Sequence, residues 1–223
     1  MKILAFDTCF NKSYIVLKDE NTILSEKIVE SNERNYHSAY LISEIRNILK
    51  SNNLFVKDID AIAVNIGPGS FTGIRAGITI ARVLAQQFNT KLVGVNSLKI
   101  LSKLNKEGNK SVITLDARKN KVYFAVYEKE NEIIAPCLIE KDELISKINN
   151  NDFVITDKSI AGYLKENSIY SLCYEDVSDN FALYLSEISY AMLDSNENFN
   201  WAEVKPLYIQ KPSITMPKAV KNG

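Results

Sequence analysis

This sequence has no excess of either charge sign, and it contains little histidine and cysteine. Its 223 residues contain 27 Lys and Arg against 27 Asp and Glu, so no whole-protein field attracts polyanions. Only the end of the chain is basic, with four lysines against one glutamate from Trp201 onward. Because proteins that hold nucleic acid alone usually carry a basic excess, this composition argues against independent RNA binding and leaves a site shared with another protein open.

A single histidine, His37, limits the metal chemistry open to the chain. A transition-metal site needs three or four suitable ligands, so we interpret His37 as a residue of a first helical turn that packs or hydrogen-bonds locally. The three cysteines, Cys9, Cys137 and Cys173, are far apart and form no CxxC pair. This spacing argues against a disulfide framework and a zinc knuckle, and it predicts reduced, buried thiols.

Long apolar runs are also missing. No stretch approaches the ~18 apolar residues that a membrane helix requires. The short apolar run at the N-terminus reaches Asp7 too soon for a signal peptide. Hydrophobic residues at 46% and charged residues at 24% are ordinary for a globular protein. We therefore expect a cytoplasmic protein with a packed core and no membrane segment.

What the chain does contain is an internal repeat. Shifting the sequence by 109 residues places Asp7 on Asp116 and Tyr14 on Tyr123 without a gap, and the Asn-Lys pair at 11–12 falls on a second Asn-Lys pair. Each copy reads as three β-strands joined by turns, and the apolar run before each aspartate aligns as well. The match predicts a duplicated structural unit.

After each three-strand unit, helical and strand patterns alternate. Apolar spacing predicts helices over 36–50, 72–88, 141–148 and 180–193, and buried strands over 61–66, 91–95 and 153–155. A repeated βββαβαβ unit is the ribonuclease H-like half that, when doubled, makes the actin-like ATPase fold. We therefore predict an α/β protein with subdomains over residues 1–105 and 106–210 and a basic tail over 211–223. Asp7 and Asp116 should face the cleft between the subdomains.

A glycine-rich loop, Gly67–Gly77 with the sequence GPGSFTGIRAG, follows a predicted strand and opens a helix. Such a loop can hold phosphate at the helix N-terminus. It lacks the lysine of a Walker loop, however, and it does not have the spacing of a dinucleotide fingerprint. A stripe of small residues then repeats every fourth position, which permits close approach by a helix of the same chain or of another protein. The stripe consists of Gly73, Gly77, Ala81 and Ala85.

Together, several segments of the chain resemble the TsaB (YeaZ) family. These segments are Phe6-Asp7-Thr8, the helix start Arg34…His37-Ser38, the loop GPGSFTGIRAG, Leu115–Arg118 with Val122-Tyr123, and the late Pro206-Leu207-Tyr208. The resemblance runs from the first strand to about Tyr208. One departure follows that tyrosine, because family members usually have an arginine soon after it and this chain has Ile209-Gln210-Lys211.

The resemblance implies a role as a non-catalytic scaffold. TsaB proteins support TsaD, together with the ATPase TsaE, in transferring a threonylcarbamoyl group to the adenosine next to the anticodon of ANN-decoding tRNAs. It implies TsaD and TsaE as partners, contact with tRNA only through the complex, and a homodimer when the protein is alone. The helices matching 36–50 and 72–88 would form the interface. The predicted interface residues are Tyr36, Tyr40, Gly73, Gly77, Ala81 and Ala85.

No catalytic residue or metal site is predicted, and the only cofactor expectation is weak or vestigial ATP or ADP binding. The residues of this vestigial cleft would be Asp7, Thr8, Asp116 and Arg118. The turns after the two aspartates contain no glycine, which hinders close approach of the backbone to a phosphate. The alternatives are a small-molecule kinase of actin-like fold, which these turns disfavour, and a glycoprotease-type metallopeptidase, which the single histidine disfavours.

Overall fold

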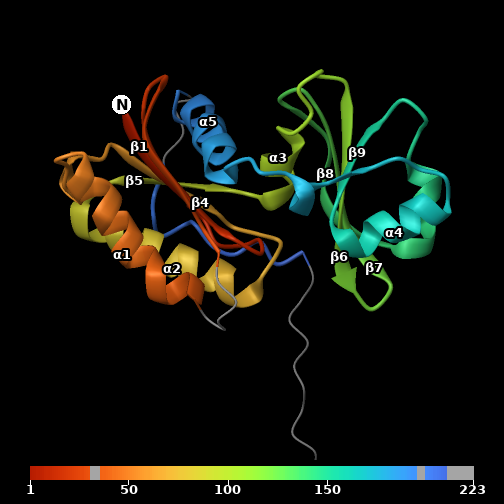
Figure 1. Ribbon diagram of the computed structural model, residues 1–223, viewed down its shortest axis with the longest axis horizontal. Coiled ribbons are helices and arrows are strands. Elements are labelled where there is room, and N and C mark those ends of the chain that lie inside the picture. The colour runs from red at the N-terminus through yellow and green to blue at the C-terminus, as the bar shows by residue number, and fades with distance from the viewer. Residues whose placement is uncertain (31–35, 195–198, 210–223) are drawn as a thin grey trace, which may run out of the picture.

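The computed structural model describes residues 1–30, 36–194 and 199–209, with side chains in the second range described from Tyr40 onward. The predicted tail, the side chain of His37 and that of Tyr36 therefore lie outside the described part. Two five-stranded sheets form the framework (Figure 1). Cys9 is buried as expected, whereas Cys137 and Cys173 are only partly buried.

The first sheet has the strand order β3-β2-β1-β4-β5. Strands β1, β2 and β3 pair antiparallel, and β4 and β5 continue the sheet in parallel to β1. The bounds of these strands are β1 Lys2–Asp7, β2 Ser13–Asp19, β3 Thr22–Val29, β4 Ala61–Asn65 and β5 Lys91–Val95.

The second sheet repeats this arrangement. Its order is β10-β9-β6-β7-β8, which is the order of the first sheet when each strand is replaced by its repeat. The bounds are β6 Lys110–Arg118, β7 Lys121–Glu128, β8 Asn131–Glu140, β9 Phe153–Thr156 and β10 Leu172–Cys173. The predicted α/β fold with duplicated ribonuclease H-like subdomains is confirmed.

Helices cover both faces of the first sheet because β1 is apolar on both faces. Leu4 and Phe6 point toward α1 and α2, while Ile3 and Ala5 point toward α3 and α5. Figure 1 shows α1 and α2 side by side on one face and α5 on the other. The helices are α1 Tyr36–Ser51, α2 Phe71–Phe88, α3 Ser97–Ser102, α4 Lys158–Glu166 and α5 Phe181–Leu193. None of the helices in the described part is both long and apolar enough to span a membrane.

Several details differ from the sequence prediction, which contained no counterpart of α3, α4 or β10. The segment predicted as a helix over 141–148 forms two short 3-10 helices, Lys141–Glu143 and Ile145–Lys147. Helix α5, which the repeat assigns to the second half, packs on β1 and β2 of the first sheet. The subdomain boundaries therefore remain a prediction.

One core runs between the two sheets and joins the halves. Phe181 at the start of α5 is fully buried there, with its ring centroid 5.3 Å from that of Phe10 and 4.9 Å from that of Tyr14. Tyr174, from the second half, lies 5.0 Å from Phe10 by the same measure. Because aromatic rings of both halves interlock, the two sheets should unfold as one unit.

We expect Phe181→Ala to lower the free energy of unfolding by about 3–5 kcal/mol, because it removes a fully buried ring from this shared core. Urea denaturation followed by circular dichroism measures the loss. Tyr170→Ala, at a side chain that is 86% exposed, is the control and should change stability by no more than about 0.5 kcal/mol. Two separate transitions in the wild-type protein would contradict a shared core.

Candidate functional site

The glycine-rich loop is held against the turn between β1 and β2. Ser70 caps α2 by accepting a hydrogen bond from the Gly73 N–H, and its own N–H donates to the Cys9 carbonyl at 2.7 Å. The Thr8 hydroxyl donates to the Gly73 carbonyl, also at 2.7 Å. The first turn of α2 and the β1–β2 turn therefore satisfy each other's backbone groups.

This contact explains why glycine is needed in the loop. A Cβ atom added at Gly73 would lie 1.7 Å from the Thr8 carbonyl oxygen, and one at Gly69 would lie 2.4 Å from the Cys9 carbonyl oxygen. One turn later, a Cβ at Gly77 would lie 2.5 Å from the Thr8 hydroxyl oxygen. The glycines allow a close approach within the chain.

The predicted interface stripe is therefore wrong. Gly73, Gly77, Ala81 and Ala85 are all buried inside the chain, the first two against the β1–β2 turn and the alanines in the core beneath α2. Small residues did indicate close approach, but the neighbour is the turn and sheet of this chain. Of the remaining predicted interface residues, Tyr40 is 43% exposed on α1. The side chain of Tyr36 is not described, so its role stays a prediction.

Asp7 ends β1 as predicted, but it does not face the cleft. Its carboxylate is fully buried and accepts hydrogen bonds from the Cys9 N–H and the Asn65 amide, each at 2.7 Å. Asn65 in turn accepts from the Gly67 N–H and the Ser97 hydroxyl. Burial raises the pKa of Asp7 to about 6, and the hydrogen bonds from Asn65 and Cys9 oppose that rise.

The cleft itself contains only half of the predicted vestigial nucleotide site. Asp116 and Arg118 line it, whereas Asp7 and Thr8 are covered by the start of α2. Its volume is about 830 Å³, and its walls come from both halves. The contributing segments are the β1–β2 turn, the glycine-rich loop, the end of β6, the first turn of α4, the 3-10 helix Tyr174–Asp176 and residues 207–209.

Carboxylates of the chain occupy the backbone donors in the second half of the cleft. The Asp116 N–H donates to Asp157 at 2.6 Å, the Arg118 N–H to Asp116 at 2.9 Å, and the Lys158 N–H to Glu175 at 2.9 Å. Asp157 also caps α4 by accepting from the Ile160 N–H. Burial raises the pKa of Asp157, against the effect of its two backbone hydrogen bonds.

A phosphate would find these N–H groups already paired and would meet net negative charge. Among the described residues, the charged side chains that line the cleft are Asp116, Asp157, Glu175 and Arg118. Three carboxylates against one guanidinium disfavour a nucleotide polyphosphate. Within the described residues, no group of three or more His, Cys, Asp or Glu side chains could hold a metal ion.

The late tyrosine crosses the cleft mouth and contacts α2. The Leu207 N–H donates to the Ile66 carbonyl at 2.9 Å, which fixes the segment beside the glycine-rich loop. Arg75 Nε donates to the Tyr208 hydroxyl at 3.2 Å. Sequence analysis missed this contact, because the two residues are 133 positions apart and no local pattern connects them.

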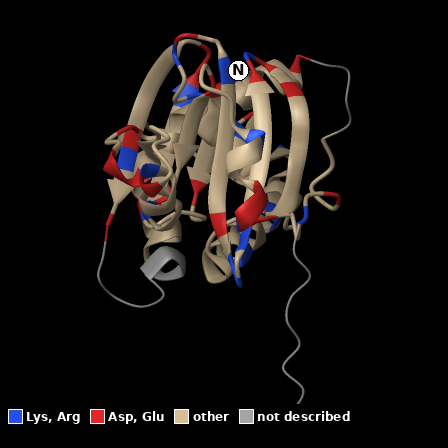
Figure 2. Cartoon of the chain, turned by 90° about the vertical axis from the view of Figure 1, so that its right-hand side faces the viewer, with Lys and Arg blue, Asp and Glu red and all other residues tan. Residues whose placement is uncertain are grey.

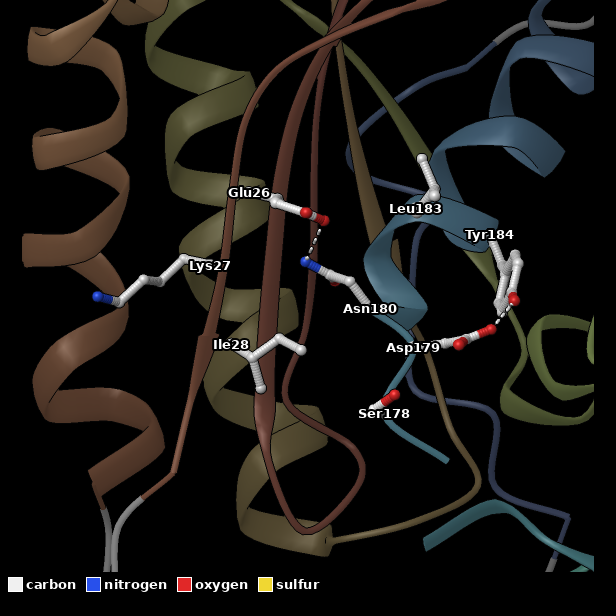
Figure 3. Close-up of a pocket in the computed structure, with 8 residues that line it drawn as sticks. All are labelled: Glu26, Lys27, Ile28, Ser178, Asp179, Asn180, Leu183 and Tyr184. Atoms are coloured by element: carbon white, nitrogen blue, oxygen red, sulfur yellow. Dashed lines mark hydrogen bonds between the residues drawn. The ribbon is translucent and has the colours of Figure 1, made fainter. Parts of the chain in front are cut away.

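A second hollow, between β3 and the start of α5, has a structural explanation (Figure 3). Asn180 caps α5 by accepting from the Ala182 N–H, and its amide donates to the Ile15 carbonyl at 3.3 Å and to Glu26 at 3.4 Å. Tyr184 on α5 donates to Asp179. These polar groups attach α5 to the first sheet.

Fold and site together define a duplicated ribonuclease H-like protein of actin-like fold whose cleft donors are used internally. A family model described as "TsaD: tRNA N6-adenosine threonylcarbamoyltransferase" matches residues 21–179, well over half of the chain. The chain therefore belongs to this family, within its TsaB (YeaZ) branch.

Individual relatives agree with this placement. The chain is 25% identical to the tRNA threonylcarbamoyladenosine biosynthesis protein TsaB of Haemophilus influenzae over 94% of both chains. It is 32% identical to TsaB of Escherichia coli over 58% of this chain and 56% of that protein. A crystal structure from Pseudomonas aeruginosa, described as similar to peptidase YEAZ, shares the fold with a TM-score of 0.75 and 21% identity, covering 94% of this chain and 99% of that one.

We expect Gly73→Ala and Gly162→Ala to change stability in opposite directions. The first would force α2 away from the Thr8 carbonyl and lower the free energy of unfolding by about 1–3 kcal/mol. The second lies in α4 with no atom within 4 Å of its added Cβ, so it should raise stability by up to about 1 kcal/mol. Urea denaturation measures both, and two changes of the same sign would contradict the proposed packing.

The buried Asp7 predicts a pH dependence of stability. Its folded pKa of about 6 lies above the ordinary 3.8, so the folded state holds the proton more tightly than the unfolded chain. Stability from this group is therefore gained as the pH falls through 6 and lost as it rises. Relative to Asp7→Asn, the wild-type protein should gain about 1 kcal/mol between pH 7 and pH 5. Denaturation at both pH values tests this, and a constant difference would be inconsistent with it.

Proposed function

We propose that this chain is a non-catalytic subunit in the biosynthesis of threonylcarbamoyladenosine in tRNA. In this role it binds a TsaD partner and, with TsaE, supports transfer of the threonylcarbamoyl group to the adenosine next to the anticodon of ANN-decoding tRNAs. It works in the cytoplasm without a cofactor of its own. In the absence of its partner it forms a homodimer.

The observation that carries the proposal is the internal use of the cleft. Two carboxylates of the chain, Asp157 and Glu175, accept from the backbone N–H groups of Asp116 and Lys158 at the end of β6 and the start of α4. The β1–β2 turn is likewise covered by α2. A kinase of this fold needs these places for phosphate, so the arrangement favours a binding role over phosphoryl transfer.

The outer surfaces of α1 and α2 provide the binding face. Their inner sides pack on the first sheet, yet several large apolar side chains remain exposed, with Val83 at 59% and Tyr40 at 43%. Away from the cleft, the exposed large apolar residues in the described part of the two helices are Tyr40, Ile42, Val83 and Phe88. An apolar face on two adjacent helices suits a helical surface of TsaD or of a second copy of this chain.

Val83→Glu should weaken association with TsaD by about 30-fold or more, because a buried, unpaired carboxylate would replace an apolar contact of 2 kcal/mol or more. Titration calorimetry with purified TsaD measures the dissociation constant. Melting of the isolated variant, measured at a dilution where the protein is monomeric, should stay unchanged, since Val83 is largely exposed. Tyr170→Glu, outside both helices, is the matched control and should bind normally.

The same preparation tests the alternative functions. Alone, the pure chain should show neither phosphoryl transfer from ATP nor metal-dependent peptidase turnover, whereas adding it to TsaD and TsaE should restore modification of tRNA. Peptidase activity, or ATP turnover that disappears in Glu175→Ala, would overturn the proposal. Normal TsaD binding by Val83→Glu would leave the subunit role intact and refute the assignment of the interface.

A further inference from the structure

A cluster of three side chains, with its two aromatic rings tilted by 37° to each other, stands at the mouth of the cleft. The Arg75 guanidinium lies 3.9 Å from the centre of the Phe71 ring, and its Nε donates to the Tyr208 hydroxyl. The two rings are 6.4 Å apart, and both are about half exposed, at 49% and 43%. These aromatic faces contribute little to the core. We call Phe71, Arg75 and Tyr208 the rim platform.

The β6–β7 turn of the second half contributes a basic side chain to the same cleft. Arg118 is exposed and lines the same cleft as Phe71 and Tyr208. Three consecutive residues, Arg118, Lys119 and Asn120, have φ values of 64°, 52° and 59°. Arg118 pairs with Lys121, so Lys119 and Asn120 form a two-residue hairpin loop, in which left-handed backbone at both central positions is the favoured geometry. The tight hairpin therefore places the exposed Arg118 at the cleft.

The cleft interior has the opposite character. Asp157 and Glu175 there already accept backbone hydrogen bonds, and they keep free carboxylate lone pairs. This charge repels phosphate, but carboxylate oxygens can accept the N–H groups of a nucleobase. The cleft thus suits a ligand whose aromatic ring and N–H donors point inward. The negative charge of such a ligand would stay at the rim.

We propose that the mouth of this cleft binds an unpaired nucleotide of RNA. The base stacks on Phe71 and Tyr208, and the phosphate lies beside Arg118. Aromatic and arginine faces that stack on unpaired bases are a common means of RNA recognition. A free nucleotide triphosphate fits less well, since its several phosphate charges would meet a single lining guanidinium, Arg118, beside three carboxylates. Within the proposed function, on which this inference rests, the RNA is the tRNA loop presented to the complex.

The balanced charge of the chain determines whether RNA binding can be measured with the isolated protein or only with its complex. Figure 2, which looks onto the second half, shows basic and acidic residues interspersed without one large basic field. The whole chain has equal numbers of the two charge signs. Because the phosphate backbone supplies most of the affinity for RNA, the isolated chain should bind weakly and the site should contribute mainly within the complex with TsaD.

The test measures tRNA binding by the complex of full-length chain and TsaD, using fluorescence anisotropy at several salt concentrations. Phe71→Ala and Tyr208→Ala should each weaken binding roughly tenfold through the lost stacking. Arg118→Ala should lower the slope of log K against log salt by about one. The matched controls Tyr170→Ala and Lys165→Ala, at exposed positions on and after α4, should leave affinity and slope unchanged.

Two further readouts separate the outcomes. Affinity for TsaD is measured for every variant, and Tyr208→Ala, which lies outside α2, decides the result if Phe71→Ala disturbs that association. Photo-crosslinking of tRNA to the wild-type chain, with or without TsaD, should map to segments 66–75, 115–123 or 207–209. Unchanged tRNA binding in all three variants, or crosslinks elsewhere only, would overturn the inference. Crosslinks in these segments without TsaD association would support it while refuting the proposed function.

Discussion

The contact between the start of α2 and the β1–β2 turn determines most of what the first half can do. The Thr8 hydroxyl and the Cys9 carbonyl bond to the helix start, and Gly73 makes room for the Thr8 carbonyl. This packing covers Asp7 completely. It also turns the small residues of α2 inward, so that the larger side chains of the helix face outward. One close approach thus buries Asp7 and leaves large apolar side chains of α2 on the surface.

The second half reaches a similar result by different chemistry. None of the described helices covers Asp116, which stays exposed at the cleft, but Asp157 and Glu175 accept from the backbone donors around it. A carboxylate with two or more N–H partners resembles a bound anion in charge and geometry. Since the halves are joined by the aromatic core around Phe10 and Phe181, no bridging ligand is needed to hold them together.

Sequence patterns predicted topology better than they predicted contacts. The alignment of Asp7 with Asp116 located both first strands correctly, because apolar runs and turns are local signals. It could not show that α2 covers one aspartate and not the other. The stripe that includes Gly73 indicated close approach, but spacing alone does not identify the neighbour. The contact of Arg75 with Tyr208 and the two-residue strand β10 have no local signal, so only tertiary structure reveals them.

The cleft has an acidic interior and a basic rim, so it favours one orientation of a bound ligand. Neither phosphoryl transfer nor a purely structural role requires this preference. In a kinase of this fold the donors inside the cleft meet phosphate, so the charge of the ligand points inward. In this chain Asp157 and Glu175 reverse that preference. Arg118, the one cation among the described residues that line the cleft, is exposed on the β6–β7 turn. Any anionic ligand must then keep its charge outside and insert its uncharged part. An unpaired nucleotide of a folded RNA meets that condition, because its base can turn inward while its phosphate stays in the backbone.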